Sequence, residues 1–92
     1  MCKYFNSENY ICRQLVDNIL LFPVSQEVSD FQGGVILNRV SHFVWKLLSV
    51  PRTKDEIVNA VSQEFNADIA MVETDIEELL NSFIEMKIVK VE

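Results

Sequence analysis

The sequence predicts an α+β fold in which a three-stranded antiparallel sheet is followed by three helices. Two observations carry this prediction. The first third of the chain holds three short runs rich in β-branched and aromatic residues, separated by turn formers. The remainder holds apolar residues at the i, i+3, i+4, i+7 spacing of amphipathic helices, interrupted by a proline and by a polar cluster.

The predicted strands are three runs, at residues 10–16, 19–22 and 35–37. Asp17-Asn18 is expected to form a tight turn between the first two runs, and Pro23 ends the second. Residues 25–34 (SQEVSDFQGG) are polar and rich in turn formers, so they predict a loop before the third run. The outer strands of such a sheet each leave one edge unpaired.

The first predicted helix carries an apolar stripe, at Val40, Phe43, Val44, Leu47 and Leu48. Asn38 or Ser41 could cap its start. Pro51 ends the helix, because the residue before a proline is pushed out of the helical region. Trp45 lies off the main stripe, and we expect it to pack on the core rather than to form a binding surface.

A capping box marks the start of the second predicted helix. The Thr53 hydroxyl can accept from the backbone three residues on, while Glu56 reaches back. This helix buries Ile57, Val58, Val61 and Phe65. Residues 66–68 break it and offer Asp68 as the next cap. The last helix has one apolar face, at Ile69, Val72, Ile76, Leu79, Leu80 and Phe83, and residues 88–91 add a short strand or extended tail. The whole order resembles a winged-helix arrangement with its strands placed first.

Length and charge restrict the function classes. We expect one domain over residues 1–92, with 49% hydrophobic and 24% charged residues. The net charge of −6 argues against nucleic acid and anionic membranes, because both are bound mainly by basic surfaces. No apolar run reaches the roughly 18 residues that span a bilayer, and we expect no signal peptide at the start of the chain. Cys2 and Cys12 suit a reducing cytoplasm, where we expect the protein to act.

The sequence contains no recognisable set of catalytic residues. His42 is the sole histidine, so no catalytic triad or zinc site can be assembled at familiar spacing. Gly33-Gly34 is interpreted as loop geometry rather than a phosphate-binding motif. The last helix is rich in acidic residues, which could form a solvated face or a face that attracts a basic peptide. They are Asp68, Glu73, Asp75, Glu77, Glu78 and Glu85. We therefore expect no enzyme activity, no metal and no cofactor.

Several short segments together resemble the PqqD family of peptide-modification chaperones. They are residues 20–24 (LLFPV), 36–38 (ILN), 43–48 (FVWKLL), Arg52-Thr53 with Glu56-Ile57, Asp75-Ile76 and Leu79-Leu80. The resemblance covers roughly Tyr10 to Val89, in the family's order and spacing. The chain departs from the family at Ser41, where glycine is frequent, and at Ser49-Val50, where an acid-glycine pair is frequent. These departures fall at the two ends of the first predicted helix.

The resemblance implies a non-catalytic recognition element for the leader segment of a ribosomally made precursor peptide. The leader would add as a strand to the edge of the third strand and lie in a groove against the last helix. A partner such as a radical-SAM enzyme, a cyclase or a peptidase would then act on the presented peptide. The candidate edge is Val35, Ile36, Leu37 and Asn38, and the candidate pocket residues are Ile69, Val72, Ile76, Leu79 and Leu80. The acids Glu73, Asp75 and Glu77 could steer basic leader residues.

Two other functions are also compatible with parts of the sequence. A winged-helix nucleic-acid-binding regulator fits the order of helices but not the charge. A structural adaptor could pair the same edge strand with its own copy and form a homodimer.

Overall fold

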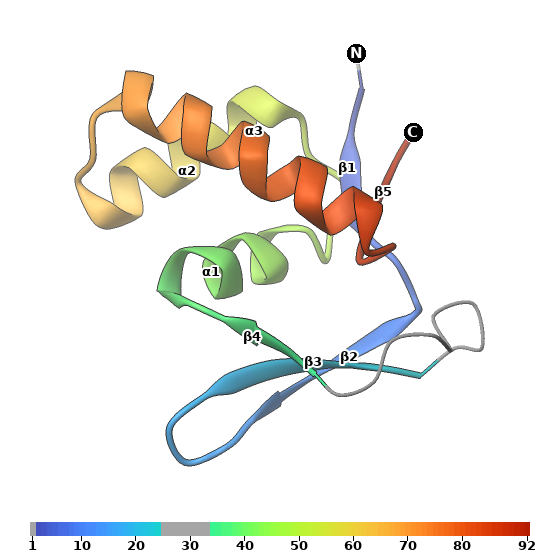
Figure 1. Cartoon of the computed structure of the whole chain (residues 1–92). Coiled ribbons are helices and arrows are strands. Elements are labelled where there is room, and N and C mark those ends of the chain that lie inside the picture. The colour runs from blue at the N-terminus through green and yellow to red at the C-terminus, as the bar shows by residue number, and fades with distance from the viewer. Residues whose placement is uncertain (1, 25–33) are drawn as a thin grey trace.

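The computed structural model describes residues 2–24 and 34–92 of the chain. In these residues five strands and three helices follow one another: β1 (Tyr4–Asn6), β2 (Tyr10–Gln14), β3 (Ile19–Pro23), β4 (Val35–Leu37), α1 (Arg39–Leu47), α2 (Lys54–Phe65), α3 (Ile69–Glu85) and β5 (Val89–Val91) (Figure 1). The antiparallel sheet has the order β2-β3-β4 and precedes the helices, so the predicted fold class is confirmed. None of the described helices is long and apolar enough to cross a membrane.

The hairpin between β2 and β3 turns one residue earlier than predicted. The Leu15 N–H donates to the Asn18 carbonyl at 2.7 Å, which leaves Val16-Asp17 as the two loop residues. The predicted strand over 10–16 therefore ends at Gln14, and Val16 is fully exposed. No local signal marked this ending, because Val16 is β-branched and such residues favour strands rather than turns.

The predicted loop over 25–34 lies mostly outside the described residues, which resume at Gly34. A Cβ at Gly34 would come within 3.2 Å of the Leu21 carbonyl oxygen. The absence of a side chain therefore lets the chain pass close to β3 immediately before β4 begins.

Asn38 and Ser41, the two alternative caps predicted for α1, act together. The Asn38 side chain accepts from the Ser41 N–H at 2.8 Å, and the Ser41 hydroxyl accepts from the Asn38 N–H at 2.8 Å. Ser41 thus builds the start of the helix at the position where it departs from the family pattern. At the other end, α1 stops at Leu47, before Pro51.

The other two helices begin at the caps that the sequence predicts. Thr53 and Glu56 form the capping box of α2, with N···O distances of 3.2 and 2.8 Å. Asp68 caps α3 by accepting from the Ala70 N–H at 3.1 Å. Between them, Asn66 ends α2 in the left-handed conformation, with φ of 50°.

Replacing Thr53 with alanine is expected to lower the free energy of unfolding by about 0.5–2 kcal/mol, because the Glu56 N–H loses its capping acceptor. Urea unfolding of the variant and the parent at neutral pH checks this value. Ser49→Ala, which changes an exposed hydroxyl that caps no helix start, is the matched control. A loss as small as that of the control would contradict a stabilising role for the box.

Glu56 also makes a pH-dependent contribution to stability. The hydrogen bonds with Thr53 are the main reason that the pKa of Glu56 lies below its usual 4.5. A lowered pKa in the folded state stabilises the fold above pH 4.5, and this stabilisation disappears as the pH falls through the folded-state pKa. The stability difference between the parent and Glu56→Gln should therefore shrink on acidification, which urea unfolding at several pH values would test. A difference that stayed constant with pH would contradict it.

A second, two-stranded sheet joins the two ends of the described chain, with β1 antiparallel to β5. The strand or tail expected at residues 88–91 is strand β5. Strand β1 was not predicted, because its three residues are too few to show a period and its partners are remote in sequence. On its other side, Tyr4 exchanges two backbone hydrogen bonds with Arg52, at 2.7 and 3.0 Å. β1 therefore ties the connection between α1 and α2 to the C-terminal strand.

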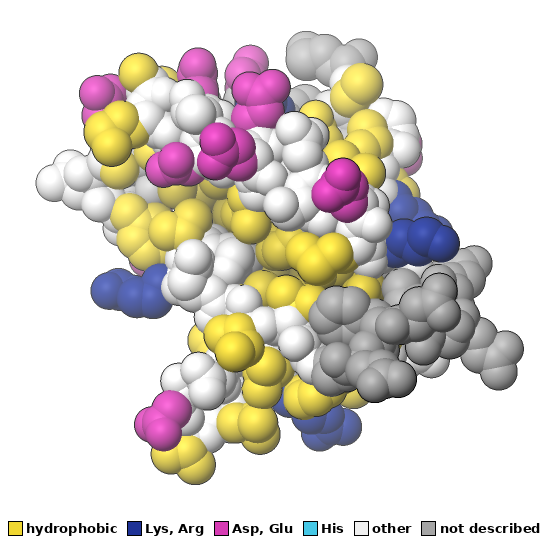
Figure 2. Space-filling model, viewed as in Figure 1, with side chains coloured by type: hydrophobic (Ala, Val, Ile, Leu, Met, Phe, Trp, Pro, Cys, Tyr) yellow, Lys and Arg dark blue, Asp and Glu magenta, His cyan; other side chains and the backbone are white. Residues whose placement is uncertain are grey.

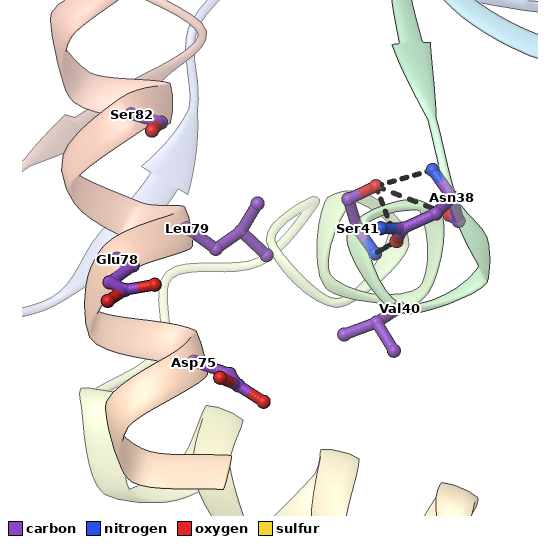
Figure 3. Close-up of a pocket in the computed structure, with 7 residues that line it drawn as sticks. All are labelled: Asn38, Val40, Ser41, Asp75, Glu78, Leu79 and Ser82. Carbon is purple, nitrogen blue, oxygen red and sulfur yellow. Dashed lines mark hydrogen bonds between the residues drawn. The ribbon is translucent and has the colours of Figure 1, made fainter. Parts of the chain in front are cut away.

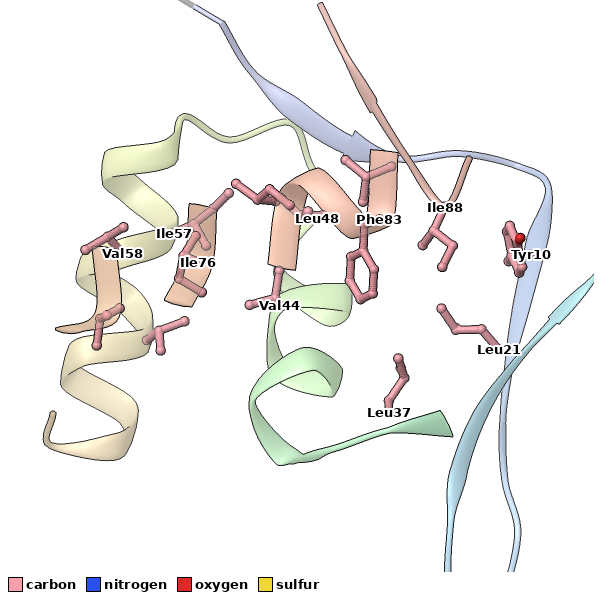
Figure 4. Close-up of a cluster of buried hydrophobic side chains, with 14 residues drawn as sticks. Tyr10, Leu21, Leu37, Val44, Leu48, Ile57, Val58, Ile76, Phe83 and Ile88 are labelled. Atoms are coloured by element: carbon pink, nitrogen blue, oxygen red, sulfur yellow. The ribbon is translucent and has the colours of Figure 1, made fainter. Parts of the chain in front are cut away.

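The hydrophobic core extends from the sheet, at Leu21 and Leu37, into the space among the three helices, at Ile57 and Ile76 (Figure 4). Trp45 packs against it partly buried, as predicted. The Tyr10 hydroxyl donates to the Met86 carbonyl at 2.8 Å, and burial raises its pKa. The fully or nearly buried side chains are Tyr10, Leu21, Leu37, Val44, Leu48, Ile57, Val58, Val61, Val72, Ile76, Leu80, Phe83, Ile88 and Val89.

Candidate functional site

The hairpin bond between Leu15 and Asn18 determines which backbone groups of β3 face β4. Along an antiparallel pair, residues alternate between those that exchange hydrogen bonds with the partner and those that do not. Leu15 and Asn18 form a hydrogen-bonded pair, so every second residue of β3 after Asn18, namely Leu20 and Phe22, forms backbone hydrogen bonds with β2. The backbone groups of Ile19 and Leu21 are therefore directed toward β4.

One residue of β4 directs its backbone outward. β4 is an outer strand of the sheet, and its Val35 and Leu37 are opposite Leu21 and Ile19 of β3. The backbone groups of Val35 and Leu37 therefore point to β3, and those of Ile36 point to the open edge. The Ile36 side chain is 66% exposed. Within the described residues, this edge offers one free N–H and one free carbonyl at the middle of the strand.

Asn38 does not extend the free edge. Its N–H donates to the Ser41 hydroxyl, and its carbonyl accepts from the His42 N–H at 2.9 Å. Of the four residues predicted to form the edge, Ile36 therefore presents the backbone groups that an added strand could use.

A groove with a volume of about 380 Å³ lies between the start of α1 and one side of α3 (Figure 3). Leu79 projects from α3 toward the Asn38–Ser41 pair, and Val40 contributes a second apolar side chain. Asp75 lies one helical turn before Leu79 on the same wall. The residues lining the groove are Asn38, Val40, Ser41, Asp75, Glu78, Leu79 and Ser82.

The groove is acidic at its α3 wall. Asp75 and Glu78 contribute two carboxylates, and no lysine or arginine is among the lining residues. Figure 2 shows acidic side chains gathered over α3, above the hollowed apolar band. An apolar strip with acids beside it suits a peptide with apolar and basic side chains.

Three of the predicted contact residues meet at this groove: Asn38, Asp75 and Leu79. Ile69 and Glu73 are exposed on the first turns of α3, but neither lines the groove. Glu77 instead lies 3.4 Å from the Lys54 ammonium on α2. The acids that line this groove are thus Asp75 and Glu78, and not Glu73 or Glu77.

Four predicted pocket or edge side chains are in the core instead. The exposed fraction is 5% for Leu37, 4% for Val72, 0% for Ile76 and 2% for Leu80. These four side chains pack in the hydrophobic core, and none of them is among the residues that line the groove. The apolar stripe of α3 was divided wrongly between core and pocket because periodicity identifies a helix face but not the depth of its burial.

The sequence prediction missed Val40, Ser41, Glu78 and Ser82. On α3 a signal was present, because Asp75, Glu78, Leu79 and Ser82 recur at i, i+3, i+4 and i+7. This row lies beside the apolar stripe of α3, on the side of the helix that faces the start of α1 across the groove.

His42 lies outside the groove, half-buried on α1. Burial, aided by the positive charge of Lys46, lowers its pKa. It lines a separate hollow with Ile19, Arg39, Phe43, Lys46, Glu64 and Phe65. In the part of the chain that the structure describes, no cluster of three or more His, Cys, Asp or Glu residues could hold a metal ion.

Comparison with known proteins gives two results. The profile of the family described as coenzyme PQQ synthesis protein D (PqqD) matches residues 12–89. The chain is also similar in structure to TbiB1, which was solved in complex with the TbiA(beta) leader peptide. The two share 21% sequence identity with a TM-score of 0.74, over 94% of each chain, which shows a common fold. No curated protein sequence gives a significant match.

Proposed function

This chain belongs to the PqqD family, and we propose that it binds the leader segment of a ribosomally made precursor peptide and presents the peptide to a modifying enzyme. The observation that carries the proposal is the free Ile36 edge of β4, which lies in the segment leading into the groove between α1 and α3. TbiB1, of the same fold, holds a leader peptide.

The leader binds by adding a strand to β4. Its backbone carbonyl accepts from the Ile36 N–H, and its N–H donates to the Ile36 carbonyl. These bonds are independent of the leader's side chains, so they provide affinity without selectivity. Alternate side chains of an added strand point to one face, and those directed toward the helices enter the groove beside Leu79. An apolar anchor buried there would gain about 1.5–3 kcal/mol.

The protein provides recognition and no chemistry of its own. Its sole histidine, His42, is half-buried beside Lys46 and away from the groove. The reaction belongs to a partner such as a radical-SAM enzyme, a cyclase or a leader peptidase. Cys2 and Cys12 are free and exposed, which suits the reducing cytoplasm in which precursor peptides are made.

The acids of the groove are expected to speed association with a basic leader more than they strengthen the complex. Replacing both Asp75 and Glu78 by their amides should lower the association rate several-fold at low salt, with little change in the dissociation rate. Stopped-flow binding at low and high salt measures this. The matched control is Glu73→Gln with Glu85→Gln, which removes two exposed α3 charges outside the groove. Equal rate losses for both pairs, or no salt dependence in the parent, would contradict steering by the groove.

A titration with the leader half of a precursor encoded beside the gene tests the function itself. Amide signals of Ile36, Val40 and residues 75–82 should shift, whereas a scrambled leader should leave them unchanged. No shift at about 1 mM peptide, where even a millimolar complex is half formed, would overturn the proposal.

A further inference from the structure

A second hollow, of about 560 Å³, lies where α3 ends and β5 begins. Two lysines line it and no carboxylate does, so its charge is opposite to that of the α3 groove. Figure 2 shows basic side chains beside the C-terminal end of α3. The lining residues are Asn9, Ile84, Lys87, Val89, Lys90 and Val91.

β5 is an edge strand beside this hollow. Lys3 and Glu92 exchange two backbone hydrogen bonds, at 3.2 and 2.9 Å, so Phe5 and Lys90 form the next bonded pair of the ladder. Val89 and Val91 therefore direct their backbone groups away from β1. In the described residues this sheet has two strands, so no third strand pairs with β5. Val89 is 2% exposed and Val91 is 44% exposed, so Val91 is the residue whose outward backbone groups an added strand can reach.

The backbone of Lys87 is fixed, and neither Lys87 nor Lys90 has an ion pair with another described residue. Lys87 has φ of 61°, and its carbonyl accepts from the Ser7 hydroxyl at 2.7 Å, which fixes the backbone that carries its side chain. Among the residues that the structure describes, the one ion pair is Lys54 with Glu77. Neither Lys87 nor Lys90 therefore has a described carboxylate within 4 Å.

Apolar side chains complete the surface. Ile84 is 37% exposed and Val91 is 44% exposed, on either side of the lysines in sequence. Along β5 the order Val89-Lys90-Val91 alternates apolar and basic residues, so the two faces of the strand differ in character.

We propose that the open edge of β5 is a second docking site, and that its occupant is an extended segment of a partner protein in which acidic and apolar residues alternate. The outward backbone groups of Val91 bond to the added strand. Lys87 and Lys90 attract its carboxylates, and Ile84 and Val91 cover its apolar side chains. The site goes beyond leader binding, because none of its residues lines the groove at α3.

Charge selects this occupant over two others. A second copy of the chain that paired through β5 would bring the lysines of both copies together, which opposes association. A basic leader suited to the acidic groove is repelled here for the same reason. The acidic groove at α3 therefore favours a basic leader, and the basic hollow at β5 favours an acidic partner segment.

Hydrogen exchange of the full labelled chain tests the proposal, with a capped peptide of alternating glutamate and valine as the probe. Exchange should slow at the Val91 amide and stay unchanged at Lys90, whose amide is already bonded to β1. Lys90→Glu should weaken binding about fivefold. Lys46→Glu, an equal charge reversal in the last turn of α1, should leave binding unchanged.

Equal binding of a lysine-valine peptide would overturn the proposal, as would protection that appeared at Ile36 instead of at Val91. No change in exchange at any amide would overturn it too. The leader titration of the same sample reports on β4 and α3, so failure of this site is distinguishable from failure of leader binding.

Discussion

Replacing Ile36 with proline is expected to abolish most leader binding while the protein stays folded. Proline has no N–H, so the one outward donor of β4 is lost, and its ring occupies the space of the added strand. An edge strand tolerates proline where the N–H faces solvent, so the sheet should survive. A lost hydrogen bond is worth about 0.5–1.5 kcal/mol, and with the blocked edge we expect more than about a tenfold loss of affinity.

Titration calorimetry with the leader measures the affinity, and thermal unfolding checks that the proline variant is folded. Ile36→Thr is the matched control, because threonine keeps the N–H and the β-branched shape and changes the exposed side chain alone. A folded proline variant that bound as tightly as the threonine variant would exclude strand addition at β4.

Replacing Ile76 with alanine is expected to lower the free energy of unfolding by about 2–5 kcal/mol, since its side chain is fully buried and its removal leaves a cavity. Native proteins typically have a free energy of unfolding of about 5–15 kcal/mol, so this loss is a large share of the total. Urea unfolding measures it.

Leu79→Ala is the matched comparison on the same helix. Leu79 is half-buried and lines the groove, so its truncation should cost less stability than that of Ile76 and more leader affinity. If the two alanine variants lost the same stability, the division of α3 into a core face and a groove flank would be wrong.

The helices were predictable because their signals are local. Asn38 with Ser41, Thr53 with Glu56, and Asp68 each cap the helix that follows them, and the contacts involved span only three residues or fewer. β1 was not predictable, since its three residues form a strand only through partners that the fold brings from elsewhere, at Arg52 and in β5.

The site was partly predictable, and the errors have definite physical causes. The sequence predicts a turn at Asp17-Asn18, but the hairpin turns at Val16-Asp17. A shift of one residue in the turn reverses which residues of β3, and hence of β4, bond inward. The free edge at Ile36 could therefore not be separated from its neighbours by pattern alone. Likewise, the groove residues of α3 depend on where α1 packs, which periodicity does not specify.

We propose that the leader adds as a strand at Ile36, and amide exchange of the labelled protein with and without leader tests this most directly. The Val35 and Leu37 backbone groups already face β3, so their protection should change little, whereas exchange of the Ile36 amide should slow in the complex. Saturation with leader that left the Ile36 amide as exchangeable as in the free protein would contradict the claim.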